Sequence, residues 1–250
     1  TDGINWIQNG ASKFAGITFA KDKWVAVTKT KSIYTSENGI NNWILVGNYK
    51  GFNCVVFYND MFIAGGLSAT GSIVVSNDGT TWTEAYSDID LSTYSISYNG
   101  RFFTAGTNKG ILYSEDGLIW SVTNNTTSVV NGGISSDDEI TVVGTKSGIY
   151  HSTDGKQWDL CTGAGSSGEW LSIVHAVNYN VNLDINDAKK FLACNNTGVA
   201  ASVDGVLWVK GKSKASGTYN GYKISNNKVI ISVVNITGDF SIGLPINITL

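Results

Sequence analysis

The 250-residue sequence predicts an all-β protein built from repeated four-stranded antiparallel sheets. Three observations support this prediction. A motif of the form Ser-x-Asp-Gly-x-x-Trp recurs along the chain, short apolar runs alternate with glycine-containing turns, and no helical periodicity extends beyond about two turns. Twenty-nine glycines and a single proline fit a chain with many tight turns between paired strands.

The motif recurs at a regular spacing. Its Asp or Asn residues are separated by 36, 40, 38, 38 and 50 residues, and they are Asp2, Asn38, Asp78, Asp116, Asp154 and Asp204. Six of the eight tryptophans stand at its final position. The copy at Asn38 has one extra residue before its tryptophan, and an insertion around 176–190 lengthens the last interval.

Each repeat divides into four short strands, expected in the third repeat at 93–99, 101–106, 110–114 and 119–123. Four antiparallel strands in about 40 residues is the period of a β-propeller blade. The sequence therefore predicts one six-bladed β-propeller domain, with blades at roughly 11–48, 52–86, 93–123, 130–161, 170–212 and 220–243. We expect the N-terminal strand at 3–9 to complete the sixth blade and close the ring, because closure removes an open sheet edge.

The motif is interpreted as a turn element. Its aspartate can accept hydrogen bonds from backbone N–H groups two residues on, its glycine supplies a positive φ, and its tryptophan buries a large ring. The copies SNDGTTW, SEDGLIW, STDGKQW and SVDGVLW resemble Asp-boxes, the bacterial-neuraminidase-type repeats of sialidases and related propellers. This resemblance implies that the motifs lie on the outer hairpin of each blade, at the rim opposite the catalytic face.

The sequence argues against an enzyme. Sialidases hold a sugar carboxylate with three arginines, whereas Arg101 is the single arginine of this chain. Other glycosidases need a pair of carboxylates, and the glutamates are spread over different repeats with no local pairing. His151 and His175 lack a zinc-ligand or nucleophile context. We therefore expect no catalytic residues.

A ligand is expected on the loops that connect one blade to the next. Aromatic rings beside Asn, Ser and Thr suit sugars, which offer apolar C–H faces and many hydroxyls. The predicted ligand-binding residues are Tyr49, Phe52, Tyr86, Tyr94, Trp170, Tyr219 and Tyr222. The alternative is that these rings begin inner strands and pack between blades.

Short acidic clusters suggest a metal site, because oxygen-rich loops of this spacing can hold Ca²⁺. The predicted ligands are Asp88, Asp90, Asp184, Asn186 and Asp187. The alternative for each cluster is a solvated turn. The cysteines Cys54, Cys161 and Cys194 show no C-x-x-C spacing and are expected to be buried or free thiols.

Composition limits the partners. A net charge of −3 disfavours nucleic acid, and no run approaches the roughly 18 apolar residues of a membrane-spanning helix, so neither nucleic-acid binding nor membrane insertion is expected. No signal peptide is visible. The chain starts within a motif copy, so we expect it to be a piece of a longer polypeptide.

The leading prediction is a non-enzymatic module that binds a receptor or glycan. Asn- and Gly-rich Asp-box propellers of this size resemble the receptor-binding tips of bacteriophage spikes and tail fibres. That resemblance implies host attachment at a virion surface, as part of a larger, oligomeric spike or fibre whose partner is a host cell-surface glycan or receptor. The alternatives are a secreted lectin or protein-interaction scaffold, and a non-sialidase glycoside hydrolase or lyase.

Overall fold

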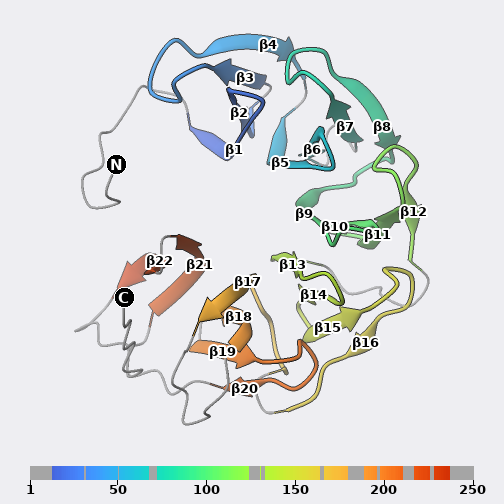
Figure 1. Ribbon diagram of the computed structural model, residues 1–250, viewed down its shortest axis with the longest axis vertical. Coiled ribbons are helices and arrows are strands. Elements are labelled where there is room, and N and C mark those ends of the chain that lie inside the picture. Colours follow the sequence, from blue (N-terminus) through green and yellow to red (C-terminus); the bar gives the residue numbers. More distant parts are fainter. Residues whose placement is uncertain are drawn as a thin grey trace. The chain divides into compact units, whose positions relative to one another are not determined.

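A computed structural model describes residues 13–30, 32–49, 51–67, 72–123, 130, 133–163, 166–179, 189–195, 198–210, 217–225 and 228–236. Every regular element among them is a β-strand (Figure 1). None of the described segments forms a helix that could cross a membrane. The chain divides into two compact units, Thr1–Thr93 and Tyr94–Leu250.

The first unit contains two four-stranded antiparallel sheets, each in sequence order. The first sheet comprises β1 (Phe14–Ala20), β2 (Lys23–Thr28), β3 (Ser32–Ser36) and β4 (Ile44–Asn48). The second comprises β5 (Phe52–Tyr58), β6 (Met61–Gly66), β7 (Ser72–Ser76) and β8 (Thr83–Ser87).

The second unit contains three four-stranded sheets and one two-stranded sheet. The first comprises β9 (Thr93–Tyr98), β10 (Phe103–Thr107), β11 (Gly110–Ser114) and β12 (Ser121–Val122). The next comprises β13 (Ile134–Ser136), β14 (Thr141–Gly144), β15 (Ile149–Ser152) and β16 (Asp159–Leu160). The third comprises β17 (Ser172–Tyr179), β18 (Lys189–Asn195), β19 (Gly198–Ser202) and β20 (Val209–Lys210), and the pair is β21 (Gly217–Ser225) with β22 (Lys228–Ile236).

The predicted all-β fold of four-stranded antiparallel sheets is confirmed. One expected strand starts later than predicted: the Asn99 side chain accepts hydrogen bonds from the N–H groups of Arg101 and Phe102, both at 3.0 Å, so 99–102 is a turn and β10 begins at Phe103. The closing strand at 3–9 and the strand expected at 239–243 lie outside the described residues. Six blades and ring closure stay predictions.

Apolar side chains fill the space between consecutive sheets of each unit. In the first unit, Val25 and Ile33 of one sheet share a cluster with Val55 and Phe62 of the next, and all four are buried. The middle strands are the most buried, because they are covered on both faces; every residue of β6 and β7 is buried. Inner strands approach closely at glycine: a Cβ added to Gly133 would lie 2.5 Å from the backbone N of Ile173.

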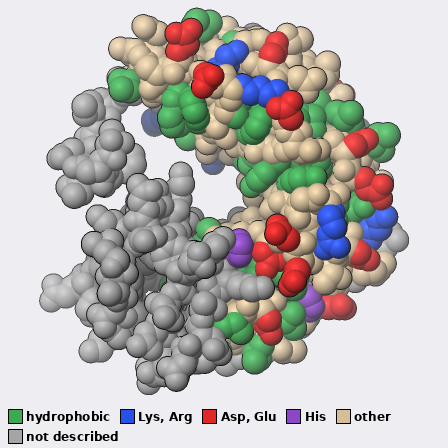
Figure 2. Space-filling model, in the orientation of Figure 1, with side chains coloured by type: hydrophobic (Ala, Val, Ile, Leu, Met, Phe, Trp, Pro, Cys, Tyr) green, Lys and Arg blue, Asp and Glu red, His purple; other side chains and the backbone are tan. Residues whose placement is uncertain are grey.

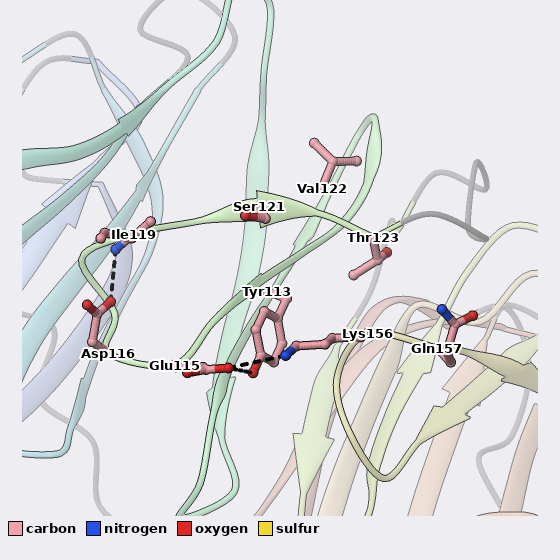
Figure 3. Close-up of a pocket in the computed structure, with 9 residues that line it drawn as sticks. All are labelled: Tyr113, Glu115, Asp116, Ile119, Ser121, Val122, Thr123, Lys156 and Gln157. Carbon is pink, nitrogen blue, oxygen red and sulfur yellow. Dashed lines mark hydrogen bonds and ion pairs between the residues drawn. The ribbon is translucent and has the colours of Figure 1, made fainter.

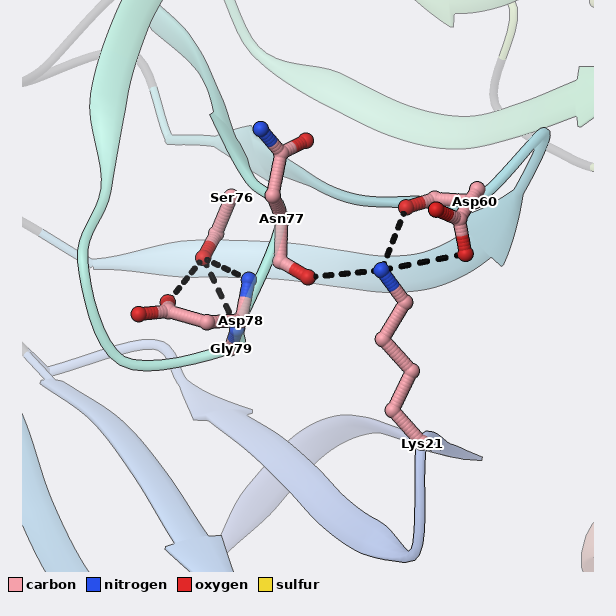
Figure 4. A network of polar contacts seen from close by, with 6 residues as sticks. All are labelled: Lys21, Asp60, Ser76, Asn77, Asp78 and Gly79. Atoms are coloured by element: carbon pink, nitrogen blue, oxygen red, sulfur yellow. Dashed lines mark hydrogen bonds and ion pairs between the residues drawn. The ribbon is translucent and has the colours of Figure 1, made fainter.

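The motif forms the turn between the third and fourth strands of a sheet, here called the repeat turn (residues 76–82, 114–120, 152–158 and 202–208, with 36–43 as a longer copy). At Ser76 the hydroxyl accepts the N–H of Gly79 at 2.8 Å and donates to Asp78 Oδ1 at 3.0 Å (Figure 4). The same Oδ1 accepts the next two N–H groups after Gly79, each at 2.7 Å. The Trp82 indole N–H donates to the Gly79 carbonyl at 3.1 Å.

The same contacts recur at Asp116, Asp154 and Asp204. At Asn38 an amide oxygen takes the role of the carboxylate, accepting two backbone N–H groups at 2.9 and 3.1 Å. The extra residue of this copy, Asn42, adopts a φ of 55°. These bonds confirm that the motif's aspartates stabilise turns.

Candidate functional site

The single arginine joins two neighbouring repeats of the second unit. The Arg101 guanidinium donates to the carbonyls of Glu139 at 3.2 Å and Thr153 at 3.3 Å. In the first unit Lys21 occupies the corresponding position: its Nζ donates to the carbonyls of Asp60 and Asn77 and pairs with the Asp60 carboxylate at 3.0 Å (Figure 4). Arg101 therefore stabilises the contact between two sheets. A sialidase would instead use arginine side chains to hold its ligand.

The predicted aromatic ligand residues lie in different environments. Phe52 is fully buried and Trp170 is 1% exposed, and the Trp170 indole donates to the Ser167 carbonyl at 3.1 Å. These two rings therefore pack in the interior and offer no platform to a ligand, as the alternative interpretation expected.

The other predicted aromatic residues are either more accessible to solvent or have side chains that the structure does not describe. Tyr49 is half-buried and its ring lies 5.8 Å from that of Phe52, the only pair of the predicted set for which the described residues give a ring contact. Tyr86 is half-buried in β8, and Tyr94 in β9 is 36% exposed. Tyr219 and Tyr222 lie in β21, but their side chains are outside the description. Ligand binding by these five residues stays a prediction.

Two of the predicted calcium ligands lie in an ordinary turn. The N–H of Leu91 donates to the Asp88 carbonyl at 3.3 Å, and Asp90 has a φ of 60°. Among the described residues, no group of three or more His, Cys, Asp and Glu side chains could hold a metal ion. Asp184, Asn186 and Asp187 lie outside the described residues, so a calcium site there stays a prediction.

Calcium binding has a direct thermal test. If Ca²⁺ binds the folded chain with a dissociation constant a hundredfold below the added concentration, linkage stabilises it by about 2.7 kcal/mol, which raises the melting temperature by several degrees. The measurement is a thermal melt, monitored by circular dichroism, in about 1 mM CaCl₂ and again in excess chelator. An unchanged midpoint would remove the calcium prediction.

The three cysteines are not activated as nucleophiles. Burial raises the pKa of Cys54, Cys161 and Cys194 to about 12, so these free cysteines are protonated thiols at neutral pH. Cys161 Sγ lies 3.5 Å from His151 Nδ1 but also donates to the Gly205 carbonyl at 3.1 Å. A nucleophilic cysteine needs a lowered pKa, so this Cys–His contact is a packing contact.

A surface groove of about 550 Å³ in the second unit is a candidate binding site. One wall is the β11–β12 hairpin with its repeat turn, and the other is the next repeat turn, at 152–158 (Figure 3). We call it the Tyr113 groove, and its lining residues are Tyr113, Glu115, Asp116, Ile119, Ser121, Val122, Thr123, Lys156 and Gln157.

Three side chains form a polar contact set in the Tyr113 groove. The Tyr113 hydroxyl donates to Glu115 Oε1 at 2.8 Å, and Lys156 Nζ lies 3.2 Å from the same oxygen (Figure 3). Lys156 also lies over the Tyr113 ring, 4.8 Å from its centroid. Gly155 positions this ring, because a Cβ there would come within 2.6 Å of Tyr113 and of Phe102.

These contacts reinforce the usual charge states of the Tyr113 groove at neutral pH. The hydrogen bond from Tyr113, followed by the hydrogen bond and charge of Lys156, lowers the pKa of Glu115. Desolvation and then the hydrogen bond to Glu115 raise the pKa of Tyr113, and the hydrogen bond to Glu115 raises that of Lys156. The groove therefore presents a carboxylate, a neutral phenol and an ammonium.

The rim of the Tyr113 groove is apolar and accessible. Ile119 is 74% exposed and Val122 is 56% exposed. Ser121 and Gln157 are exposed polar neighbours with hydroxyl and amide groups. The groove thus combines methyl groups, one aromatic ring, and donors and acceptors of both signs. Among the described residues of each unit visible in Figure 2, acidic and basic side chains are interspersed and form no single basic patch.

The sequence interpretation missed the Tyr113 groove, because it assigned ligands to the inter-blade loops and treated the motif as structural throughout. One signal was available in the sequence. The residue between Ser and Asp is variable, and in SEDG it is a glutamate, a residue that the turn itself does not require.

Comparison with solved structures identifies the fold. Virginiamycin B lyase from Staphylococcus aureus matches with a TM-score of 0.66 at 13% identity, covering 90% of this chain and 84% of its own. The WD40 β-propeller domain of Doa1 matches at 0.62 and 14%, covering 89% and 76%. YCF48 from Cyanidioschyzon merolae matches at 0.60 and 14%, covering 88% and 79%. This chain is therefore a β-propeller.

No protein-family model matches the chain, and the search of curated proteins finds no match. The narrower resemblances, to Asp-box repeats and to bacteriophage spike tips, therefore stay predictions from the motif. At these identities the solved structures define the fold alone.

Proposed function

We propose that this β-propeller is a non-enzymatic recognition module that binds a cell-surface saccharide in the Tyr113 groove. The observation that carries the proposal is that the Tyr113–Glu115–Lys156 contact set shares one groove with exposed apolar side chains. A volume of about 550 Å³ lies within the usual range of small-ligand sites.

The chemistry of the Tyr113 groove favours a sugar. The anionic Glu115 is a strong acceptor for sugar hydroxyls, while Lys156 and Gln157 supply donors. The methyl groups of Ile119 and Val122 can cover the C–H face of a pyranose. A peptide would find less support, since β12 is only two residues long and offers few main-chain partners.

The two carboxyl groups of the groove, Glu115 and Asp116, are poorly suited to act as a general acid. A general acid needs a carboxyl group with a raised pKa, whereas that of Glu115 is lowered. Asp116 is similar, because the N–H groups of Ile119 and Leu118 lower its pKa. These directions favour binding over hydrolysis. An enzyme is the second candidate, since virginiamycin B lyase, a structural neighbour, is one by its name.

Substitution of Tyr113, which supplies the aromatic ring of the groove, tests this proposal. Tyr113→Ala should weaken saccharide binding at least tenfold, because it removes a ring and its hydrogen bond from the groove. Binding is measured by NMR amide shifts during titration with the methyl pyranosides of glucose, galactose, mannose and N-acetylglucosamine, after a glycan array has ranked them.

The controls separate binding from folding and from catalysis. Glu84→Gln changes an exposed glutamate of β8 outside the groove and should leave binding unchanged. Melting temperatures establish that each variant is folded. Absence of any shift with every sugar would contradict saccharide binding and would favour the scaffold alternative. Release of oligosaccharide from a surface polysaccharide would instead favour a glycoside hydrolase or lyase.

A more specific role extends this proposal. The resemblance of the motif-bearing sequence to bacteriophage spike tips supports host attachment by a virion protein, which would place the module outside the cell as part of a larger assembly. In that role the saccharide is a glycan or receptor of the host surface. Binding of the full chain to host cells, and its loss in Tyr113→Ala, tests this role.

A further inference from the structure

A second groove lies in the first unit, with a volume of about 540 Å³. It is bounded by the β3–β4 hairpin and by the following repeat turn, at 76–82. We call it the Glu37 groove, and its lining residues are Lys23, Thr35, Ser36, Glu37, Asn38, Asn42, Ile44, Val46 and Thr80.

The two grooves occupy equivalent positions of two repeats. Glu37 and Glu115 both follow the serine in SENG and SEDG, and both side chains are exposed. The opposite wall is also equivalent, because Thr80 and Lys156 each stand two residues after the aspartate of the following repeat turn. At the position of these glutamates the other described copies have Asn77, Thr153 and Val203.

The chemistry of the Glu37 groove is similar to that of the Tyr113 groove. The lining of this groove includes the carboxylate residue Glu37 and two amide residues, Asn38 and Asn42. Ile44 is 65% exposed and supplies the apolar rim, as Ile119 does in the other groove.

Two differences mark the Glu37 groove as the weaker site. Thr35 replaces the Tyr113 ring and is only 6% exposed. The ammonium comes from Lys23, which donates to the Asp78 carbonyl at 2.8 Å and comes from a strand, whereas Lys156 comes from a repeat turn.

We propose that the Glu37 groove is a second saccharide site of the same class, so that each chain binds two sugar units independently. This inference rests on the proposed function of the Tyr113 groove. Because Thr35 offers no aromatic ring, the Glu37 groove binds the shared sugar about tenfold more weakly than the Tyr113 groove. A polymer with repeated units then has two separate points of attachment on one chain.

The experiment is an NMR titration of the intact chain with the four methyl pyranosides named above. Two sets of amide shifts are expected, one at 36–42 and one at 114–120 and 154–158, with the first set saturating at about tenfold higher sugar concentration. Glu37→Gln should lower the affinity reported by the first set of shifts about tenfold and leave the affinity reported by the second set unchanged. Glu115→Gln should do the reverse. Glu84→Gln is the matched control and should alter neither.

The outcomes separate the two proposals. Shifts confined to the Tyr113 groove would overturn the second site and leave the proposed function intact. Equal loss of both sets in Glu37→Gln, with an unchanged melting temperature, would overturn the independence of the two sites. No shift in either groove would contradict the proposed function, and the second site with it.

Discussion

Replacing Trp158 with alanine should lower the free energy of unfolding by about 3–5 kcal/mol, the usual cost of truncating a buried tryptophan. The Trp158 ring is 2% exposed and belongs to a cluster with Ile111, Ile134 and Val143, from two neighbouring sheets of the second unit. Its indole N–H also donates to the Gly155 carbonyl at 3.1 Å. The substitution therefore removes packing between sheets and a hydrogen bond that closes the repeat turn. Urea denaturation followed by circular dichroism measures the loss.

Trp43 provides the matched control, since it is the tryptophan of another motif copy. It is half-buried, and its ring lies 4.7 Å from that of Phe14. Because less of its surface is removed from water, Trp43→Ala should cost only about 1–2 kcal/mol. Equal losses for the two variants, or a loss below about 1 kcal/mol for Trp158→Ala, would contradict the conclusion that the motif tryptophan stabilises the packing between sheets.

Much of the fold was predictable because its determinants are local. In the repeat turn the side-chain hydrogen bonds of Asp78 and Ser76 reach only two or three residues along the chain, so the motif carries its own geometry. The strands follow in the same way from alternating apolar runs. The start of β10 was not predicted because the Asn99 side chain accepts the N–H groups of Arg101 and Phe102. The apolar pattern of a strand does not reveal such competition between a side chain and strand pairing.

The site was less predictable because its contacts are not local. Glu115 and Lys156 are 41 residues apart, and they meet because consecutive sheets are aligned repeat against repeat. Aromatic residues in loops were taken as ligand platforms, yet composition does not tell a buried ring such as Trp170 from an exposed one such as Tyr94. What distinguishes Trp170 is its packing beside Phe191 in the interior.

Acid should destabilise this protein through its repeat turns. Hydrogen bonds from backbone N–H groups lower the pKa of Asp78 and Asp116. At Asp154 and Asp204 partial burial acts in the opposite direction, but hydrogen bonds from the following N–H groups and from serine outweigh it, and the pKa is again lowered. All four carboxylates therefore bind protons less readily in the folded state than in the unfolded chain.

The sign of the effect follows from this difference. The unfolded aspartate has a pKa of about 3.9, so the stabilisation is fully present above about pH 5 and is lost as the pH falls through the lower folded values. Each carboxylate resembles a helix N-cap in accepting two backbone N–H groups, and losing such an acceptor typically costs about 1 kcal/mol. All four carboxylates are exposed, so solvent screening reduces this contribution, and the four turns together should lower the free energy of unfolding by about 1–2 kcal/mol between pH 7 and pH 2.

Asparagine substitution isolates one turn, since Asn38 already performs the same role with an amide oxygen. Asp116→Asn should keep most of the stability at pH 7 and lower the acid sensitivity, because one linked proton is removed. Asp159→Asn, on β16 outside the repeat turns, serves as the control and should keep the pH dependence of the parent chain. The free energy of unfolding is measured by urea denaturation at intervals from pH 7 to pH 2. A free energy independent of pH, or equal effects of the two substitutions, would show that the turn carboxylates do not stabilise the fold through their charge.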